Sequence, residues 1–238
     1  MVQITGHVFG GLWTIRRQFA DFNEAERSDQ VRAWSRKMLT LMGVELVVRG
    51  TPPATGSGRL LVANHISWLD ILVMDAAQPA RFVSKADVKH WPLLGSLITG
   101  AGTLYIERES RRDALRVVHH VAERLLADDV IAIFPEGTTG DGVALLPFHA
   151  NLFQAAISAN AKVVPVALSY MHATTGTRHS APTYVGDTTL IGSIWATLRA
   201  TGLQAVVVYG EAQGFEGRSR REWAQDVRSA ITALLSPP

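Results

Sequence analysis

The sequence predicts an α/β fold, with a mixed central sheet flanked by helices and an amphipathic helical arm at the N-terminus. Short apolar runs alternate with longer segments of helical periodicity, which is the pattern of a layered α/β domain. The apolar fraction of 47% and the charged fraction of 18% are typical of a globular chain. The 238 residues are enough for one domain with a sizeable core.

The predicted arm covers residues 1–50, and a stretch rich in Gly and Pro at residues 50–58 separates it from a main domain over residues 51–238. Apolar side chains recur through the arm at helical spacing, and basic ones such as Arg16, Arg17 and Arg36 stand among them. This pattern suits a helix that lies in a lipid interface. It equally suits an amphipathic helix packed on the domain, and the sequence leaves both interpretations open.

Beyond the arm, the apolar runs predict strands at residues 60–63, 81–84, 103–107, 130–134, 162–170 and 204–209. The periodic segments predict helices at residues 68–77, 113–127, 152–159, 190–200 and 220–235. Periodicity does not fix the order of the strands in the sheet.

Composition and missing motifs exclude several classes of protein. The net charge of +2 is too weak to indicate nucleic-acid binding, and the absence of cysteine excludes thiol catalysis and cysteine-ligated zinc. No Gly-x-Ser-x-Gly, phosphate-loop or His-Glu-x-x-His motif is present. No segment reaches the roughly 18 to 20 apolar residues needed to span a bilayer, and the N-terminus lacks the pattern of a secretion signal.

Residues 60–70 are interpreted as a buried strand that runs into a helix. On one continuous helix His65 and Asp70 would point about 140° apart, so they can meet only if the helix begins after His65. Ser67 is a suitable N-cap, and its pairing with Asp70 resembles a capping box. A carboxylate bonded to one imidazole nitrogen leaves the other nitrogen free to take a proton. The spacing alone fits a catalytic base and a merely structural helix start equally well.

Two further strand ends carry candidate chemistry. Residues 134–142 place a Pro-Glu-Gly turn after one predicted strand, where sites in α/β proteins gather. Residues 102–108 end another strand at Arg108, whose guanidinium could bind a phosphate with two hydrogen bonds. The alternative for Arg108 is an ion pair with a neighbouring acid such as Glu107 or Glu109.

Four short blocks stand in order along the chain: Asn64-His65 with Asp70, Glu107-Arg108, the Phe-Pro-Glu-Gly-Thr run at residues 134–138, and the Val-Pro-Val run at residues 164–166. In this order they resemble the glycerolipid acyltransferases, which acylate lysophosphatidic acid and related lysolipids. The match to the second block is loose. The blocks cover about residues 60–170, and four of them in the family's order form a specific signal.

The resemblance implies an O-acyltransferase that moves a fatty acyl chain from a thioester donor, acyl-CoA or acyl carrier protein, to the free hydroxyl of a lysolipid in a membrane. His65 would be the general base on that hydroxyl, and Asp70 would orient His65. The residues that would bind the acceptor are Arg108, Glu136, Gly137, Thr138 and Asn64. Because thiolate is a good leaving group, no metal, cofactor or covalent enzyme intermediate is expected. Residues 51–238 would be the catalytic domain, acting peripherally or monotopically at the cytoplasmic face of the membrane.

Three departures from the family pattern bear on the acceptor. Thr139 and His149 stand where the family often has basic residues, and Glu107 is longer than the usual Asp or Asn. Fewer fixed cations are therefore expected around the acceptor. Lysophosphatidic acid remains the first expectation, and zwitterionic lyso-ornithine lipid is the alternative. A non-enzymatic lipid-binding module is a further alternative, against which the retained His65 and Asp70 speak.

Overall fold

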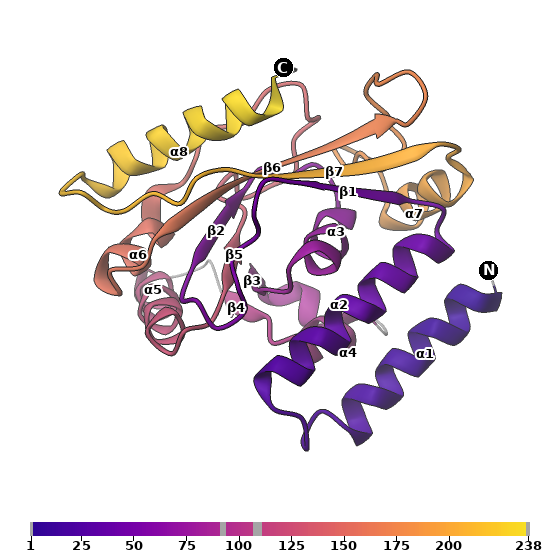
Figure 1. Cartoon of the computed structure of the whole chain (residues 1–238), viewed down its shortest axis with the longest axis horizontal. Coiled ribbons are helices and arrows are strands. Elements are labelled where there is room, and N and C mark those ends of the chain that lie inside the picture. The colour runs from indigo at the N-terminus through magenta and orange to yellow at the C-terminus, as the bar shows by residue number, and fades with distance from the viewer. Residues whose placement is uncertain (1, 91–93, 107–110, 237–238) are drawn as a thin grey trace.

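A seven-stranded sheet forms the centre of the protein in a computed structural model, which describes residues 2–90, 94–106 and 111–236. Along the sheet the strands follow the order β1-β7-β6-β2-β5-β3-β4, and every neighbouring pair is parallel except β6 and β7 (Figure 1). The strands are β1 (Glu45–Arg49), β2 (Leu60–Ala63), β3 (Arg81–Lys85), β4 (Leu104–Ile106), β5 (Ile131–Ile133), β6 (Val163–His172) and β7 (Leu203–Tyr209). The mixed sheet predicted from the sequence is confirmed.

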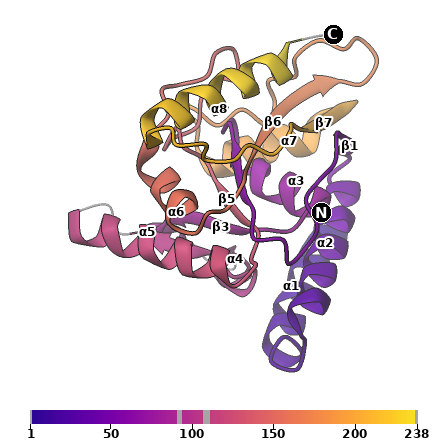
Figure 2. The ribbon, with the colours of Figure 1, turned by 60° about the vertical axis from the view of Figure 1, so that its left-hand side comes forward.

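Helices cover both faces of the sheet, as Figures 1 and 2 show. The helices are α1 (Val2–Arg17), α2 (Glu24–Leu41), α3 (Leu69–Ala77), α4 (Leu94–Gly100), α5 (Arg111–Leu126), α6 (Phe153–Ser158), α7 (Leu190–Arg199) and α8 (Arg220–Leu235), with short 3-10 helices at Ala86–His90 and Ala150–Leu152. All six predicted strands and all five predicted helices of the main domain are present, and each described end lies within two residues of the predicted one. The predicted strand end at Glu107 lies outside the described residues.

The central strand β2 divides the interior into two cores, because its successive side chains point to opposite faces of the sheet. Leu61 and Ala63 pack with α2, α3 and one face of β6 and β7, whereas Leu60 and Val62 pack with α5, α6 and α8. All four side chains are completely buried. A strand that is apolar on both faces is expected where helices cover both faces of a parallel sheet.

The prediction of a helical arm over residues 1–50 is wrong for the last part of that range. The helical portion ends at Leu41, and Glu45–Arg49 forms β1, which pairs in parallel with β7 at one edge of the sheet. This short edge strand has only half-buried and exposed side chains, so it lacks the continuous apolar run that marks the inner strands. The helix α4 was not predicted either.

The helices α1 and α2 form a hairpin in which α2 is part of the main core. A capping box at Asn23 and Glu26 starts α2, and Met38 and Leu39 on this helix are buried against α3 and the sheet. No helix in the described part of the chain is long and apolar enough to cross a bilayer. The interpretation of a helix packed on the domain is therefore confirmed for α2.

The contact between α1 and α2 depends on a glycine. Gly11 is buried, and a Cβ at this position would lie 2.5 Å from Nε1 of Trp34. The Trp34 ring cannot move away cheaply, because Nε1 donates a hydrogen bond to the carbonyl of His7 at 3.1 Å and the indole stacks on the His7 ring at 5.0 Å. Gly10, one position earlier on the same helix, has nothing within 4 Å of such a Cβ.

The substitutions Gly10→Ala and Gly11→Ala are expected to change stability in opposite directions. Alanine within a helix is favoured over glycine by up to about 1 kcal/mol, so Gly10→Ala should stabilise the protein. Gly11→Ala should destabilise it by about 1–3 kcal/mol, because the new methyl group overpacks the Trp34 contact. Urea unfolding of both variants measures the two signs, and equal stabilisation by both would contradict the packing of α1 on α2.

Candidate active site

The candidate site lies at the carboxyl ends of two neighbouring parallel strands. Asn64 and His65 follow β2, and the segment from Phe134 to Thr138 follows β5. β2 pairs directly with β5, so both segments leave the sheet at the same edge. This edge is where open α/β sheets place their ligands. The pairing of strands thus joins two blocks that are about 70 residues apart in the sequence.

Asn64 joins the end of β2 to β6. Its side-chain nitrogen donates to the carbonyl oxygen of Leu168 at 3.0 Å, and its side-chain oxygen accepts from the N–H of Leu168 at 2.7 Å. The residue is almost completely buried. The structure therefore gives Asn64 a role in positioning the backbone next to His65, and contact of Asn64 with the acceptor stays a prediction.

His65 and Asp70 meet, as the sequence suggested they could. Nδ1 of His65 lies 2.7 Å from Oδ2 of Asp70. The Asp70 side chain is wholly buried, whereas the His65 side chain is 20% exposed. Within the described residues Nε2 of His65 has no hydrogen bond, and His65 lines the large cavity described below. A carboxylate that accepts a hydrogen bond from Nδ1–H fixes the imidazole in the tautomer whose Nε2 can accept a proton.

Asp70 accepts hydrogen bonds from three further groups. Oδ2 also accepts the backbone N–H groups of Ile66 at 2.7 Å and Ser67 at 3.0 Å, and Oδ1 accepts the hydroxyl of Tyr170 at 2.6 Å. Four donors therefore compensate the buried carboxylate, which keeps its charge tolerable inside the core. Burial, followed by the neighbouring charge of Asp70, raises the pKa of Tyr170 well above its ordinary value, so this hydroxyl stays a donor.

The predicted capping box is only half formed. The Asp70 carboxylate does accept the N–H of Ser67, but the Ser67 hydroxyl accepts from the N–H of Leu69 at 3.2 Å and not from that of Asp70. The helix α3 begins at Leu69, with Trp68 as its N-cap residue. Because the Asp70 carboxylate reaches back across the turn to the N–H groups of Ile66 and Ser67, it also lies beside the imidazole of His65.

Glu136 supports the backbone of the His65 turn. Oε1 accepts the N–H of His65 at 2.7 Å, and Oε2 accepts the N–H of Leu146 at 2.8 Å. The N–H of Gly140 in turn donates to the carbonyl of His65 at 2.7 Å. Burial raises the pKa of Glu136, and the two backbone hydrogen bonds oppose that shift. Both carboxylate oxygens thus hold protein backbone, and direct contact of Glu136 with the acceptor stays a prediction.

The other predicted acceptor-binding residues are placed differently. Gly137 has a φ of 73°, a backbone conformation that favours glycine, and it allows the turn after Glu136. Thr138 is exposed on the same loop. Arg108 and Glu107 lie outside the described residues, so the proposed phosphate contact stays a prediction.

Two aromatic residues of the site were not predicted from the sequence. The Phe134 ring stacks on the His65 ring with 4.1 Å between centroids and 12° between planes, and thereby fixes the plane of the imidazole. Tyr170 lies 100 residues from Asp70. The only signal for Tyr170 was a phenol within a largely apolar strand, where a buried hydroxyl needs a partner.

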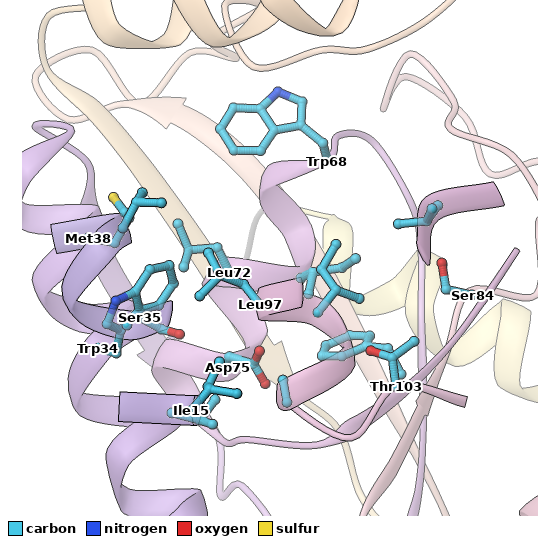
Figure 3. A pocket seen from close by; sticks show the side chains of 18 of the residues that line it. Ile15, Trp34, Ser35, Met38, Trp68, Leu72, Asp75, Ser84, Leu97 and Thr103 are labelled. Carbon is cyan, nitrogen blue, oxygen red and sulfur yellow. The ribbon is translucent and has the colours of Figure 1, made fainter. Parts of the chain in front are cut away.

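A large apolar cavity of about 400 Å³ opens next to His65. It continues between α1, α2, α3, α4 and α7, and Figure 3 shows Trp68 on one side of it and Ile15 and Trp34 on another. The named lining residues are mostly aliphatic or aromatic and, within the described chain, include no Lys or Arg. Such a volume and lining are typical of a site for an apolar ligand.

A histidine that is oriented by a buried carboxylate, beside an apolar cavity at the edge of an α/β sheet, is an arrangement that can supply a general base to an enzyme reaction. Comparison with known proteins gives the family. A family model described as Acyltransferase matches residues 45–169. The chain belongs to the Acyltransferase family.

Relatives of two kinds are similar over most of the chain. A 1-acyl-sn-glycerol-3-phosphate acyltransferase of Neisseria gonorrhoeae is 41% identical over 211 residues, which cover 88% of this chain and 82% of the relative. A lyso-ornithine lipid O-acyltransferase of Rhizobium meliloti is 34% identical over 217 residues, which cover 86% of this chain and 74% of the relative. The crystal structure of a 1-acyl-sn-glycerophosphate acyltransferase from Thermotoga maritima matches with a TM-score of 0.65 at 16% identity, over 98% of this chain and 95% of that one, and supports the fold.

The buried Asp75 makes stability depend on pH. Burial raises the pKa of Asp75 from 3.8 to about 8, and the hydrogen bond from the N–H of Ala80 partly opposes the shift. The charge of Asp75 acts on the Tyr209 hydroxyl on β7, whose pKa is raised mainly by burial and further by Asp75. Between pH 3.8 and about 8 the folded state binds more protons than the unfolded state, so the stabilising contribution of the protonated carboxyl is lost as pH rises through this window.

Asp75→Asn is expected to remove this pH dependence. The variant should gain stability relative to the wild type as pH rises from 5 to 8, reaching on the order of a few kcal/mol, and the difference should level off above pH 8. Asn keeps an oxygen for the N–H of Ala80, so the comparison isolates the ionisation. Urea unfolding at pH 5, 6.5, 8 and 9 measures the difference, and a difference that is constant across this range would contradict the raised pKa.

Proposed function

We propose that this protein transfers a fatty acyl chain from a thioester donor to the free hydroxyl of a membrane lysolipid, with lysophosphatidic acid as the acceptor and phosphatidic acid as the product. The observation that carries the proposal is the His65–Asp70 pair. Nε2 of His65 has no hydrogen bond among the described residues, and His65 lines an apolar cavity. The relatives of this chain named as 1-acyl-sn-glycerol-3-phosphate acyltransferases support the choice of acceptor.

In the proposed reaction, Nε2 of His65 takes the proton of the acceptor hydroxyl while the hydroxyl oxygen attacks the thioester carbonyl. Asp70 accepts the hydrogen bond from Nδ1–H throughout and stabilises the imidazolium that forms. The carbon–sulfur bond of the tetrahedral intermediate then breaks, and the imidazolium returns its proton to the leaving thiolate. The new ester bond and the free thiol balance the reaction without a metal or a covalent intermediate on the enzyme.

The acyl chain of the donor is proposed to lie in the cavity beside His65. The chain has no polar groups to satisfy, and burying its methylene groups contributes about 0.8 kcal/mol each. The helices α1 and α2 supply a large part of the cavity wall, through residues such as Val8, Ile15 and Trp34. The donor is either acyl-CoA or an acylated acyl carrier protein, because both present the same thioester.

A second acceptor, lyso-ornithine lipid, is favoured by two positions at which this chain lacks the Arg or Lys that the family often has. Thr139, which stands where the family often has a basic residue, donates its hydroxyl to the carbonyl of Tyr184 and so serves to hold two loops together. His149 is exposed. Relatives named as lyso-ornithine lipid O-acyltransferases match the chain at 33–38% identity. A zwitterionic head group needs fewer fixed positive charges than a phosphate monoester does.

His65→Ala is expected to abolish acyl transfer while leaving the fold intact. Loss of a general base costs at least about 10²–10⁴-fold in rate. The measurement is product mass from purified protein, an acyl-CoA and a panel of lysophosphatidic acid and lyso-ornithine lipid. His120→Ala, which removes an exposed histidine of α5, is the matched control and should leave turnover unchanged. Substantial turnover by His65→Ala with either acceptor would refute the catalytic role, and the panel separates the two acceptors.

The protein is proposed to act on the cytoplasmic face of a membrane, where acyl thioesters are found, with α1 against the lipid. Phe9 and Trp13 on α1 are 55% and 58% exposed, and Arg16 and Arg17 follow in the last turn of the same helix. Exposed aromatic residues next to basic ones suit the boundary between acyl chains and phosphate groups. The cavity that would take the acyl chain lies directly behind this helix.

The double substitution Phe9→Ser and Trp13→Ser is expected to weaken binding to phosphatidylglycerol vesicles by about tenfold or more, because insertion of each aromatic ring contributes about 1.5–3 kcal/mol. Deleting the arm is a poorer test, since α2 carries core residues. The matched control replaces Leu115 and Leu126, two equally exposed apolar residues of α5, by Ser. Vesicle co-sedimentation measures binding, and an equal loss in the control would contradict a specific role of α1.

A further inference from the structure

Among the described polar side chains that line the cavity, Ser35 and Asp75 are the two that are almost completely buried. Ser35 on α2 and Asp75 on α3 both line it and are only 1% and 5% exposed. Among the described residues, Asp75 has one hydrogen bond, from the N–H of Ala80 to Oδ1, and the hydroxyl of Ser35 has none. Figure 3 shows the oxygens of both residues among the apolar side chains around the pocket. A buried polar atom that lacks a protein partner is usually matched by a ligand or an ordered water.

Within the described residues, one side chain on α2 and one on β7 also have a buried polar atom without a hydrogen-bond partner. In the described part of the chain, Oη of Tyr209 and Nε of Arg32 are buried and have no hydrogen-bond partner. Burial is the main cause of the raised pKa of Tyr209; the charge of Asp75 adds to the shift and that of Arg32 opposes it, so both act on Tyr209 through space. Each buried unsatisfied group costs about 1–3 kcal/mol. Tyr209 and Arg32 do not line the cavity, so a polar group bound inside it would meet Ser35 and Asp75.

The Ser35–Asp75 pair lies along the path of the acyl chain, away from the reacting carbonyl. Asp75 follows Asp70 by five residues on the same helix α3, which is about 7.5 Å along the helix axis. Asp70 is bonded to His65, where the thioester carbonyl must lie. In Figure 3, Leu72 and Leu97 lie between Trp68 and Asp75. A group bound by Asp75 would therefore belong to the middle or far part of the chain.

We propose that Ser35 and Asp75 form a hydrogen-bonding subsite for a hydroxyl group carried by the acyl chain, so that the enzyme selects hydroxylated acyl donors. This inference rests on the proposed binding of the acyl chain in the cavity. A hydroxyl group both donates and accepts, as do a serine hydroxyl and a carboxyl group. A charged group on the chain would be excluded, because the lining includes no cation within the described residues to neutralise it.

The test compares coenzyme A thioesters of one chain length, either unsubstituted or bearing a single hydroxyl group at successive positions along the chain. For the wild type, the ratio of kcat/KM for hydroxylated over unsubstituted donor should peak at one mid-chain or distal position. Ser35→Ala and Asp75→Leu should each lower that peak ratio by about tenfold, as expected when a site loses a hydrogen bond to a substrate hydroxyl. Asp75→Asn should retain most of the preference, since an amide also donates and accepts.

Thr14→Val is the matched control. Thr14 lines the same cavity, but its hydroxyl already donates to the carbonyl of Gly10 at 3.1 Å. This variant should leave the ratio unchanged. Activity of all variants with the unsubstituted donor shows that each is folded, and Ser35→Ala decides the question if Asp75→Leu does not fold.

A ratio near one at every hydroxyl position in the wild type, or a peak that Ser35→Ala leaves intact, would overturn the proposal and assign the Ser35–Asp75 pair to ordered water. Failure of the proposed function is a different result, namely no transfer by the wild type from any thioester to any lysolipid. In that case calorimetric binding of hydroxylated and unsubstituted fatty acids, in the wild type and Ser35→Ala, still tests the subsite. Equal affinities of both ligands for the wild type would reject it.

Discussion

The Asp70 carboxylate is the interaction on which the site depends. It is wholly buried and accepts four hydrogen bonds, from the His65 ring, two backbone N–H groups of the turn and the Tyr170 hydroxyl. A buried charge is tolerated only when donors of this kind surround it, so the turn, the imidazole and β6 must all be in place together. The same contacts that allow the charge also fix the position of the histidine.

The surrounding backbone is held by residues that do not need to touch a substrate. Asn64 ties the end of β2 to β6, and Glu136 ties the His65 turn to the loop after β5. Stacking of Phe134 on the imidazole then leaves little freedom to the ring. Catalytic groups are effective when their supporting residues remove such freedom in advance. Glu136 and Gly137 of the Phe-Pro-Glu-Gly-Thr run thus have structural roles, in holding the His65 turn and in allowing the turn that follows.

The cavity links the catalytic edge of the sheet to the N-terminal helices. Its walls combine α3, which starts at the Asp70 turn, with α1 and α2, whose close contact depends on Gly11 and Trp34. A helix pair that shields an apolar channel on one side and exposes Phe9 and Trp13 on the other joins the proposed membrane surface to the proposed acyl site. Ser35 and Asp75 stand out in this mostly apolar wall because their polar atoms are deeply buried, and exceptions to local packing rules concentrate at functional sites.

The sequence alone determined the layered α/β fold and the inner strands, because these follow from local periodicity. Its short spacing allowed His65 to meet Asp70 without requiring it. It missed β1, whose edge position leaves its side chains too exposed for an apolar run, and it misjudged the capping of α3. Only the tertiary structure decided that Glu136 supports the His65 backbone, that Tyr170 completes the shell of Asp70, and that Asp75 faces a cavity. Those contacts join residues far apart in the chain, and their geometry depends on strand order, which periodicity does not encode.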